Sequence, residues 1–221
     1  MKRRQAAGYA ARSALFLACM AVARVCGAGE QRYEPLSASV HAILHRSVAD
    51  RASPRLAFES QAEGAVWLVE MSKRMEKYIP DDITRQDFLT TVQYEATRAG
   101  LDPQLVLGLI QVESKFRKYA VSKAGARGLM QVMPFWVKEI GDPAHNLFQE
   151  RINLRYGCTI LRHYLDRERG NLGNALGRYN GSLGQRDYPN RVLKAWKERW
   201  ALGAEKIALS RSLRSTRPGL S

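Results

Sequence analysis

A single acid, Glu113, ends an otherwise apolar run of the sequence that begins at Leu105. If this run is helical, Glu113 shares a face with Val106, Leu109 and Ile110, which lie seven, four and three residues before it. A carboxyl group lined by aliphatic side chains is poorly solvated when charged, so we expect burial to raise its pKa. These residues therefore make Glu113 a candidate general acid near neutral pH.

Taken alone, a glutamate near the end of a helix is more often a partly exposed residue, here paired with Lys115 or Arg117. The residues around Glu113 change this balance, because several ordered motifs accompany it. They are Glu113-Ser114-Lys115-Phe116 with Ala120-Val121-Ser122 and Gly125-Ala126-Arg127-Gly128-Leu129-Met130-Gln131-Val132-Met133-Pro134, then Asn146-Leu147, Asn153-Leu154 and Gly157, and finally Arg178-Tyr179-Asn180-Gly181-Ser182 with Tyr188-Pro189 and Val192.

Together these motifs resemble the lytic transglycosylases of the soluble lytic transglycosylase type, over about residues 85 to 200. The resemblance implies an all-α, lysozyme-like catalytic domain that cleaves the β-1,4 bond between N-acetylmuramic acid and N-acetylglucosamine in peptidoglycan. It implies that Glu113 acts first as acid and then as base, and that the product is 1,6-anhydromuramic acid. One departure is Gly177-Arg178 before Tyr179-Asn180, where the family often has two alanines.

The resemblance also implies a set of substrate-binding residues. They are Ser114, Met130, Gln131, Tyr179, Asn180 and Tyr188. Each residue type has a structural alternative: methionine and tyrosine are common in cores, asparagine suits a helix C-terminus, and serine and glutamine suit a solvated surface. The sequence alone leaves both readings open for most of them.

Hydrolysis of a glycosidic bond usually takes two carboxyl groups, and we find only one in an apolar helical pattern. Asp142, Asp166 and Asp187 fall in expected loops or on solvated faces. A hydrolytic muramidase is therefore the first alternative function, and Asp142 or Asp187 would then position the water. A non-catalytic peptidoglycan-binding or secretion-system assembly protein is the second alternative, although we would expect it to lack Glu113 or the Gln131 loop.

The elements that must position these residues are helices, because strand alternation is nearly absent. Asp102 and Pro103 predict the start of the Glu113 helix, as N-cap and first helical residue. The other helices are expected over residues 60–78, 84–98, 134–140, 152–165, 174–179 and 189–200. We expect a single lysozyme-like domain over residues 59–202.

The segments outside this domain are expected to serve other purposes. Residues 1–28 have a basic start, a short apolar stretch and small residues at the end, which predicts a signal peptide and export to the periplasm. Residues 29–58 read as a linker or poorly ordered segment with one short helix, in which His41 and His45 are surface residues. Residues 203–221 read as a basic, disordered tail.

Charge and cysteine content limit the expected partners. The formal net charge is +14, and removal of the five basic residues before position 29 would leave +9, which suits an anionic polymer such as peptidoglycan. We expect no nucleic acid as partner and no stable membrane insertion after signal removal, and the sequence does not identify cell-envelope assembly partners. No cofactor or metal is expected, because no histidine or cysteine cluster has ligand spacing. Cys158 lies in an apolar helical pattern and reads as core.

Overall fold

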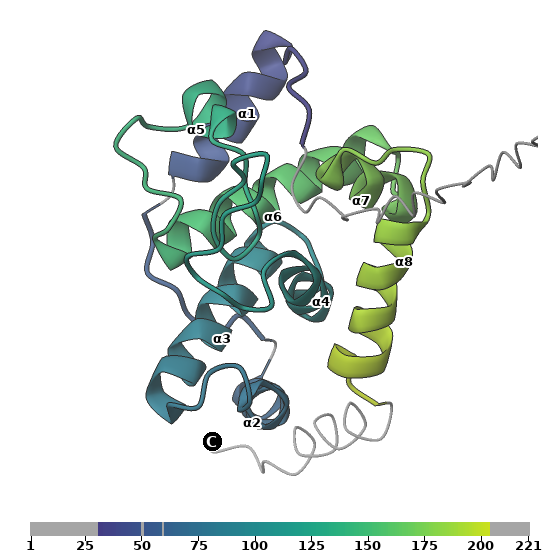
Figure 1. Ribbon diagram of the computed structural model, residues 1–221. Coiled ribbons are helices and arrows are strands. Elements are labelled where there is room, and N and C mark those ends of the chain that lie inside the picture. Colours follow the sequence, from purple (N-terminus) through teal and green to yellow (C-terminus); the bar gives the residue numbers. More distant parts are fainter. Residues whose placement is uncertain (1–30, 50, 59, 204–221) are drawn as a thin grey trace, which may run out of the picture.

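The computed structural model describes residues 31–49, 51–58 and 60–203 (Figure 1). Its helices are α1 (Ala38–Ala49), α2 (Gln61–Met75), α3 (Asp82–Arg98), α4 (Pro103–Glu113), α5 (Phe135–Ile140), α6 (Glu150–Arg167), α7 (Leu172–Asn180) and α8 (Asp187–Lys194), which continues into the π-helical segment η1 (Ala195–Trp200). Within these ranges the chain has no strand, only isolated bridges in the loop before α5. The prediction of an all-α domain is thus confirmed for the described part of the chain.

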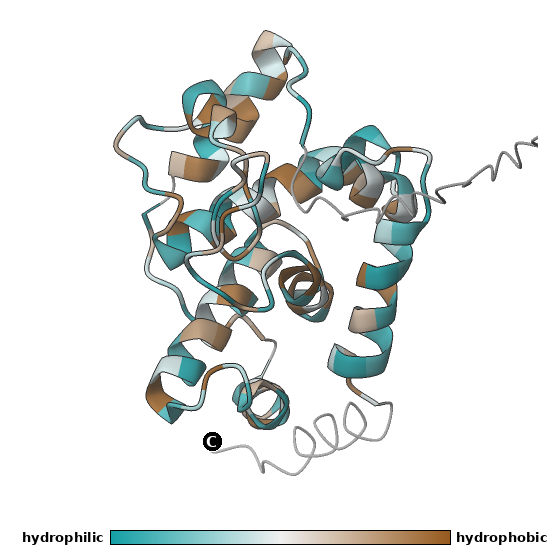
Figure 2. Cartoon of the chain, viewed as in Figure 1, coloured by the Kyte–Doolittle hydropathy of each residue, from teal (hydrophilic) through white to brown (hydrophobic). Residues whose placement is uncertain are grey.

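Helix α4 lies at the centre of the domain, in contact with α3, α8 and η1 (Figure 1). Its start is the one that the sequence predicts: the Asp102 side chain accepts a hydrogen bond from the Gln104 backbone, and Pro103 follows. Figure 2 shows α4 largely brown, because it is apolar on most of its circumference. A helix of this kind is stable only when other helices surround it, which fixes its end inside the domain.

Segment η1 approaches α4 more closely than most side chains would permit. A Cβ on Gly108 would lie 2.8 Å from the backbone nitrogen of Trp196, so only glycine fits at this position. Farther along, the Trp200 indole donates a 2.9 Å hydrogen bond to Gln111. These contacts hold the C-terminal end of the domain against the helix that carries Glu113.

The segment before α2 packs on the domain. The sequence reads it as a linker with one short helix, and that helix is α1, which contacts α5 and α6. Leu44 and Val48 are buried, whereas His41 and His45 are exposed as expected. The predictions for residues 1–28 and for the tail beyond residue 203 fall outside the described residues. No described helix is long and apolar enough to cross a membrane.

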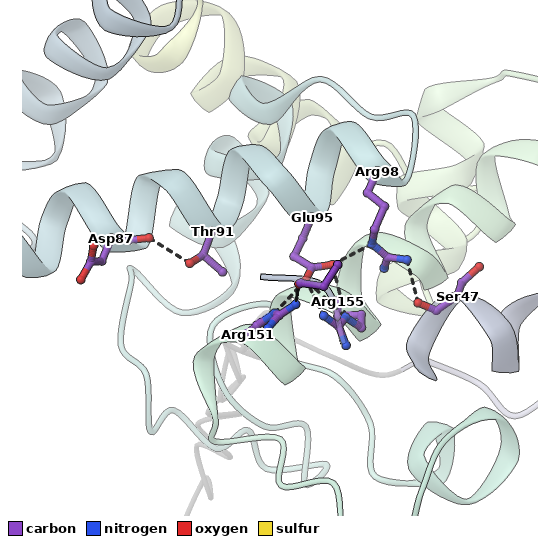
Figure 3. A network of polar contacts seen from close by, with 8 residues as sticks. Ser47, Asp87, Thr91, Glu95, Arg98, Arg151 and Arg155 are labelled. Carbon is purple, nitrogen blue, oxygen red and sulfur yellow. Dashed lines mark hydrogen bonds and ion pairs between the residues drawn. The ribbon is translucent and has the colours of Figure 1, made fainter. Parts of the chain in front are cut away.

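A buried carboxylate joins three of the helices (Figure 3). Glu95 on α3 is completely buried and accepts hydrogen bonds from Arg155 at 3.0 Å and from Arg98 at 3.0 Å, with Arg151 at 3.5 Å. Arg98 also donates to the carbonyl oxygen of Ser47 on α1 at 2.7 Å. Since Arg151 and Arg155 belong to α6, the cluster connects α1, α3 and α6. The positions of these residues in the sequence do not predict that they form a cluster.

Candidate active site

Glu113 is the last residue of α4, and its side chain is 5% exposed. The aliphatic side chains that share its face, Val106, Leu109 and Ile110, are all fully buried. Burial of this apolar face inside the domain carries the carboxyl group into the interior with it. The placement predicted from the helical spacing is therefore confirmed.

Burial raises the pKa of Glu113 to about 7. Two groups oppose this shift: the Tyr188 hydroxyl, which donates a 2.5 Å hydrogen bond to Oε1, and the positive charge of Arg191. The other carboxyl oxygen, Oε2, has no hydrogen-bond partner among the described residues. A buried group that is half protonated at neutral pH and has one unoccupied oxygen can give up and take back a proton at that oxygen.

Ser114 follows Glu113 directly, and its side chain is 1% exposed. Its hydroxyl donates to the carbonyl oxygen of Ile110 at 3.2 Å, and its backbone N–H does the same at 3.0 Å. These bonds end α4 and satisfy a terminal carbonyl group. Ser114 thus lies beside Glu113, but its hydroxyl is already used by the helix end.

Gln131 lies in the tight turn before α5, with a φ of 49°, in the left-handed region that non-glycine residues rarely adopt. Its side chain is buried, and Nε2 donates to the carbonyl oxygens of Gly128 at 2.9 Å and Ala120 at 3.2 Å. These bonds offset the backbone strain and hold the two ends of the loop together. We call residues 128–133 the Gln131 turn.

Asn153 of helix α6 holds the Gln131 turn in place. The Asn153 side chain accepts a 2.8 Å hydrogen bond from the Met130 backbone and donates to the carbonyl oxygens of Arg127 and Leu147 at 2.8 and 2.9 Å. Both N–H groups of this buried amide, and its oxygen, therefore bond backbone groups. The sequence marks Asn153 only as part of the motif match and gives no indication of this role.

Met130 packs into the space left by a glycine. A Cβ on Gly157 of α6 would lie 2.4 Å from Met130 Sδ, so glycine is required there. The Met130 carbonyl oxygen accepts a 2.7 Å hydrogen bond from the hydroxyl of Tyr179 on α7. Both side chains are fully buried. Met130 and Tyr179, two of the predicted binding residues, are therefore in contact with each other in the core.

Tyr179 is close enough to Glu113 for the charge of that carboxylate to affect it. Burial raises the pKa of Tyr179 well above the usual value, and the Glu113 charge raises it further. Asn180, the next residue, ends α7 and is buried, and Gly181 follows in the left-handed conformation. The position of Asn180 thus fits a residue that ends a helix.

Tyr188, a substrate-binding residue according to the family resemblance, is buried on the first turn of α8. Its hydroxyl contacts Glu113 directly, a role that the sequence did not predict. The Cys158 side chain is buried, as predicted, and burial raises the pKa of its thiol. The predicted site residues therefore form two connected sets, Glu113 with Tyr188, and Tyr179 with the Gln131 turn.

Gln31 lies before the first helix and outside the motifs, and no pattern in the sequence indicates its position at the site. Its side chain is 3% exposed. The amide oxygen accepts a 3.2 Å hydrogen bond from the Met133 backbone, and the amide nitrogen donates to the Gln131 carbonyl oxygen at 3.4 Å. A segment expected to be a linker therefore places a side chain on the Gln131 turn.

Comparison with known proteins shows what the part of the chain that holds Glu113, the Gln131 turn and Tyr188 is similar to. A family model described as the Transglycosylase SLT domain matches residues 90–199. The transglycosylase of Enterobacteria phage PRD1 is 35% identical over 111 residues, which cover 47% of this chain and 41% of the phage protein. A membrane-bound lytic murein transglycosylase C of Histophilus somni (strain 2336) is 46% identical over 97 residues, which cover 38% of this chain and 27% of that protein.

The chain spans less than half the length of these curated relatives. Among solved structures, the lytic transglycosylase Slt of Pseudomonas aeruginosa, in an inactive mutant, is 20% identical with a TM-score of 0.40. That likeness covers 71% of this chain and 30% of the other. It is too distant to bear on the site.

Proposed function

Since residues 90–199 match the family model of the Transglycosylase SLT domain, we propose that this protein is a peptidoglycan lytic transglycosylase. Its substrate is the β-1,4 bond between N-acetylmuramic acid and N-acetylglucosamine, and its product ends in 1,6-anhydromuramic acid. The observation that carries the proposal is the state of Glu113. It is buried at the end of α4, has a pKa of about 7, and has one oxygen without a partner among the described residues.

In the proposed reaction Glu113 donates its proton to the glycosidic oxygen, and the bond from that oxygen to C1 of the muramic acid breaks. The 2-acetamido oxygen of the same sugar stabilises the positive charge that develops at C1, as in substrate-assisted glycosidases. The C6 hydroxyl oxygen then attacks C1, and its proton passes to the Glu113 carboxylate. The residue returns to its protonated state, and no water is consumed.

Tyr188 has a defined place in this scheme. Its hydroxyl is held on Oε1 of Glu113, which leaves Oε2 to exchange the proton. Because a hydrogen bond to the carboxylate favours the charged form, Tyr188 also stabilises Glu113 after the proton has left. A group that serves as acid and then as base needs both forms to be accessible near the working pH.

The remaining predicted residues, Ser114, Met130, Gln131, Tyr179 and Asn180, are proposed to shape the substrate site. Their side chains are nearly all buried and are engaged with backbone groups or packed in the core. Their contribution is therefore mainly to hold the backbone of the Gln131 turn and the start of the α7–α8 loop in place. Sugar recognition would then fall largely to backbone N–H and carbonyl groups.

The hydrolytic alternative needs a second carboxylate to position water, and the candidates for it are Asp142, Asp166 and Asp187. Asp142 lines a cavity of about 470 Å³ near His145, between α1 and the start of α6. Asp166 pairs with Arg162, and Asp187 is exposed on the first turn of α8. The groups that affect the pKa of Glu113 are Tyr188 and Arg191, neither of which is an acid.

We further propose that the protein is exported and acts in the periplasm, where peptidoglycan lies. The basic and apolar start of the sequence supports a signal peptide over residues 1–28. The high positive charge suits an anionic polymer. N-terminal sequencing of the exported protein tests this: it should begin near Gly29, and a protein in the cytosol that still begins at Met1 would exclude it.

Digestion of purified sacculi followed by mass spectrometry tests the reaction. The products should end in 1,6-anhydromuramic acid, lighter by one water than muramidase products, because an attached C6 hydroxyl competes strongly with water. Glu113→Gln should release at least about 100-fold less product. Glu198→Gln, at an exposed position, is the matched control and should match the wild type. Predominantly reducing ends would instead support the muramidase, and activity in folded Glu113→Gln would rule out this residue as the acid.

A further inference from the structure

The cavity between α1 and the start of α6 is lined by none of the residues of the candidate active site. Its volume is about 470 Å³. Sites for small organic ligands typically measure about 300–1,000 Å³, so the cavity is larger than a single inorganic ion needs. Val48, Ala49 and Ile152 line part of it. The cavity therefore has room and apolar wall for a small organic molecule.

Three arginines line the same cavity. Arg51 follows the end of α1 and is exposed, whereas Arg151 and Arg155 lie one turn apart on α6. Nε and Nη2 of Arg151 bond Glu95 and the carbonyl oxygen of Ala52, and its Nη1 has no hydrogen bond to the described residues. Since arginine keeps its charge at every physiological pH, this wall of the cavity stays positive.

The acids around the cavity do not balance this charge. Glu95 lies behind Arg151 and Arg155 and also pairs with Arg98, so three guanidinium groups share one carboxylate (Figure 3). Among the described residues that line the cavity, the one acid is Asp142, which is exposed. With Arg51 included, four arginines thus face two acids. An excess of positive charge in a partly enclosed space attracts anions.

The N-terminal end of α6 adds to the positive potential. Gln149 is the N-cap of this 18-residue helix and lines the cavity, and its side chain makes no capping hydrogen bond. The first turn of a helix carries a partial positive charge and favours anions nearby. His145 also lines the cavity, but burial lowers its pKa, so the ring is neutral at pH 7. The arginines and the end of α6 are therefore two separate sources of positive potential at one cavity.

We propose that this cavity binds a short acidic peptide, with its carboxylates on Arg51 and Arg151 and its apolar part against Val48 and Ile152. The planar guanidinium group suits a carboxylate, which it can bind through two parallel hydrogen bonds. For the source of the peptide the proposal rests on the proposed function, because the stem peptides of peptidoglycan are short and carry free carboxylates. The cavity thus gives the protein a contact with the peptide part of its substrate in addition to the glycan.

Calorimetric titration of the full chain with N-acetyl-alanyl-glutamate tests the proposal, since this probe has two carboxylates and no amine. Saturable binding is expected. Arg51→Gln should weaken Kd about 10-fold, because a charge-assisted hydrogen bond is lost. Arg55→Gln is the matched control: it removes the same charge at an exposed residue of the same segment that does not line the cavity. It should change Kd by less than about 2-fold, because salt screens distant charges.

A variant of opposite sign separates binding from damage to the fold. Asp142→Asn removes the negative charge that lines the cavity, and the asparagine oxygen can still accept from the Ala144 N–H. It should tighten Kd about 3-fold, because a like charge near the ligand is removed. The uncharged probe N-acetyl-alanyl-glutamine amide should not bind to any of these proteins. Thermal melts establish that each variant is folded.

Two results would overturn the proposal: no saturable binding of N-acetyl-alanyl-glutamate to the wild type, or equal losses in Arg51→Gln and Arg55→Gln. Inorganic phosphate shares the anionic chemistry but has no apolar part. If phosphate binds as tightly as the dipeptide at equal ionic strength, the assignment to a peptide is wrong. Failure of the proposed function would look different, because sacculi would then yield no anhydro products while the dipeptide still bound.

Discussion

The Tyr188 hydroxyl donates a 2.5 Å hydrogen bond to Oε1 of Glu113, from a residue 75 positions later in the sequence. The bond stabilises the charged carboxylate, whereas burial disfavours it. The two effects compete, with burial the larger, and the pKa settles at about 7. The contact between α8 and α4 thus sets the pH range in which Glu113 can exchange a proton.

Replacement of Tyr188 by phenylalanine should move this range upward. Without the hydroxyl, the carboxylate loses a charge-assisted hydrogen bond, and the pKa of Glu113 should rise by about one unit. The basic limb of the pH–rate profile, where protonated Glu113 is lost, should shift to higher pH by the same amount, and the maximal rate should fall. The control is Tyr119→Phe, at a tyrosine that is 72% exposed. An unshifted profile in Tyr188→Phe would show that the bond does not tune the acid.

Glu113 also makes stability depend on pH, because its pKa is raised from 4.5 in the unfolded chain to about 7 in the folded protein. The folded state holds the proton more tightly, so the associated stability is fully present below pH 4.5 and is lost as pH rises through 7. Glu113→Gln removes this dependence. Its unfolding free energy relative to wild type should therefore increase by about 3 kcal/mol from pH 4.5 to pH 8. Urea denaturation at several pH values measures the difference, and a constant difference across this range would contradict the raised pKa.

A methyl group at position 157 should disturb the Gln131 turn. Gly157→Ala places a Cβ 2.4 Å from Met130 Sδ, which forces Met130 and the turn to move. We expect a loss of about 1–3 kcal/mol in unfolding free energy, together with lower activity on sacculi. Gly173→Ala is the matched control, since its Cβ would lie 3.5 Å from the nearest side-chain atom. Equal stability of the two variants would mean that the packing around Met130 is not tight.

Loss of the buried carboxylate should be costly. Glu95→Gln leaves Arg98, Arg151 and Arg155 without the negative charge that they surround. Removal of one partner from a buried ion pair lowers the unfolding free energy by about 3–5 kcal/mol. Glu198→Gln at an exposed pair should change it by less than about 0.5 kcal/mol. Denaturant titration compares the two, and similar small losses would show that the cluster does not stabilise the fold.

Much of the fold follows from local signals. Asp102 and Pro103 specify the start of α4 without help from distant residues, and the prediction there is confirmed. Helix α1 is harder to predict, because only Leu44 and Val48 are buried and its periodicity is weak. The sequence predicts a helix over residues 189–200, but the π-helical form of its last part, η1, has no local signal. Its position depends on the close approach of Trp196 to Gly108, a contact between segments far apart in the sequence.

The candidate site likewise contains some features that the sequence predicts and others that it does not. Glu113 can be predicted because its aliphatic neighbours lie on its own helix. Its bond to Tyr188 cannot, because it depends on how α8 packs against α4. Gln31 is beyond prediction from the sequence, since a lone glutamine before a helix has no distinguishing pattern. Side chains that act within one helix leave a periodic signal, whereas those that meet across helices do not.

The hydrogen bond between Asn153 and the Met130 backbone matters for protein engineering. The Asn153 amide bonds the Met130 backbone, which lies 23 positions earlier in the sequence, and Gly157 on the same helix leaves the space that Met130 fills. The Gln131 turn is therefore specified as much by α6 as by its own residues. A chimera that received residues 128–133 alone would lack the side chains that hold them in place. A graft onto another scaffold must therefore carry α6 together with the turn.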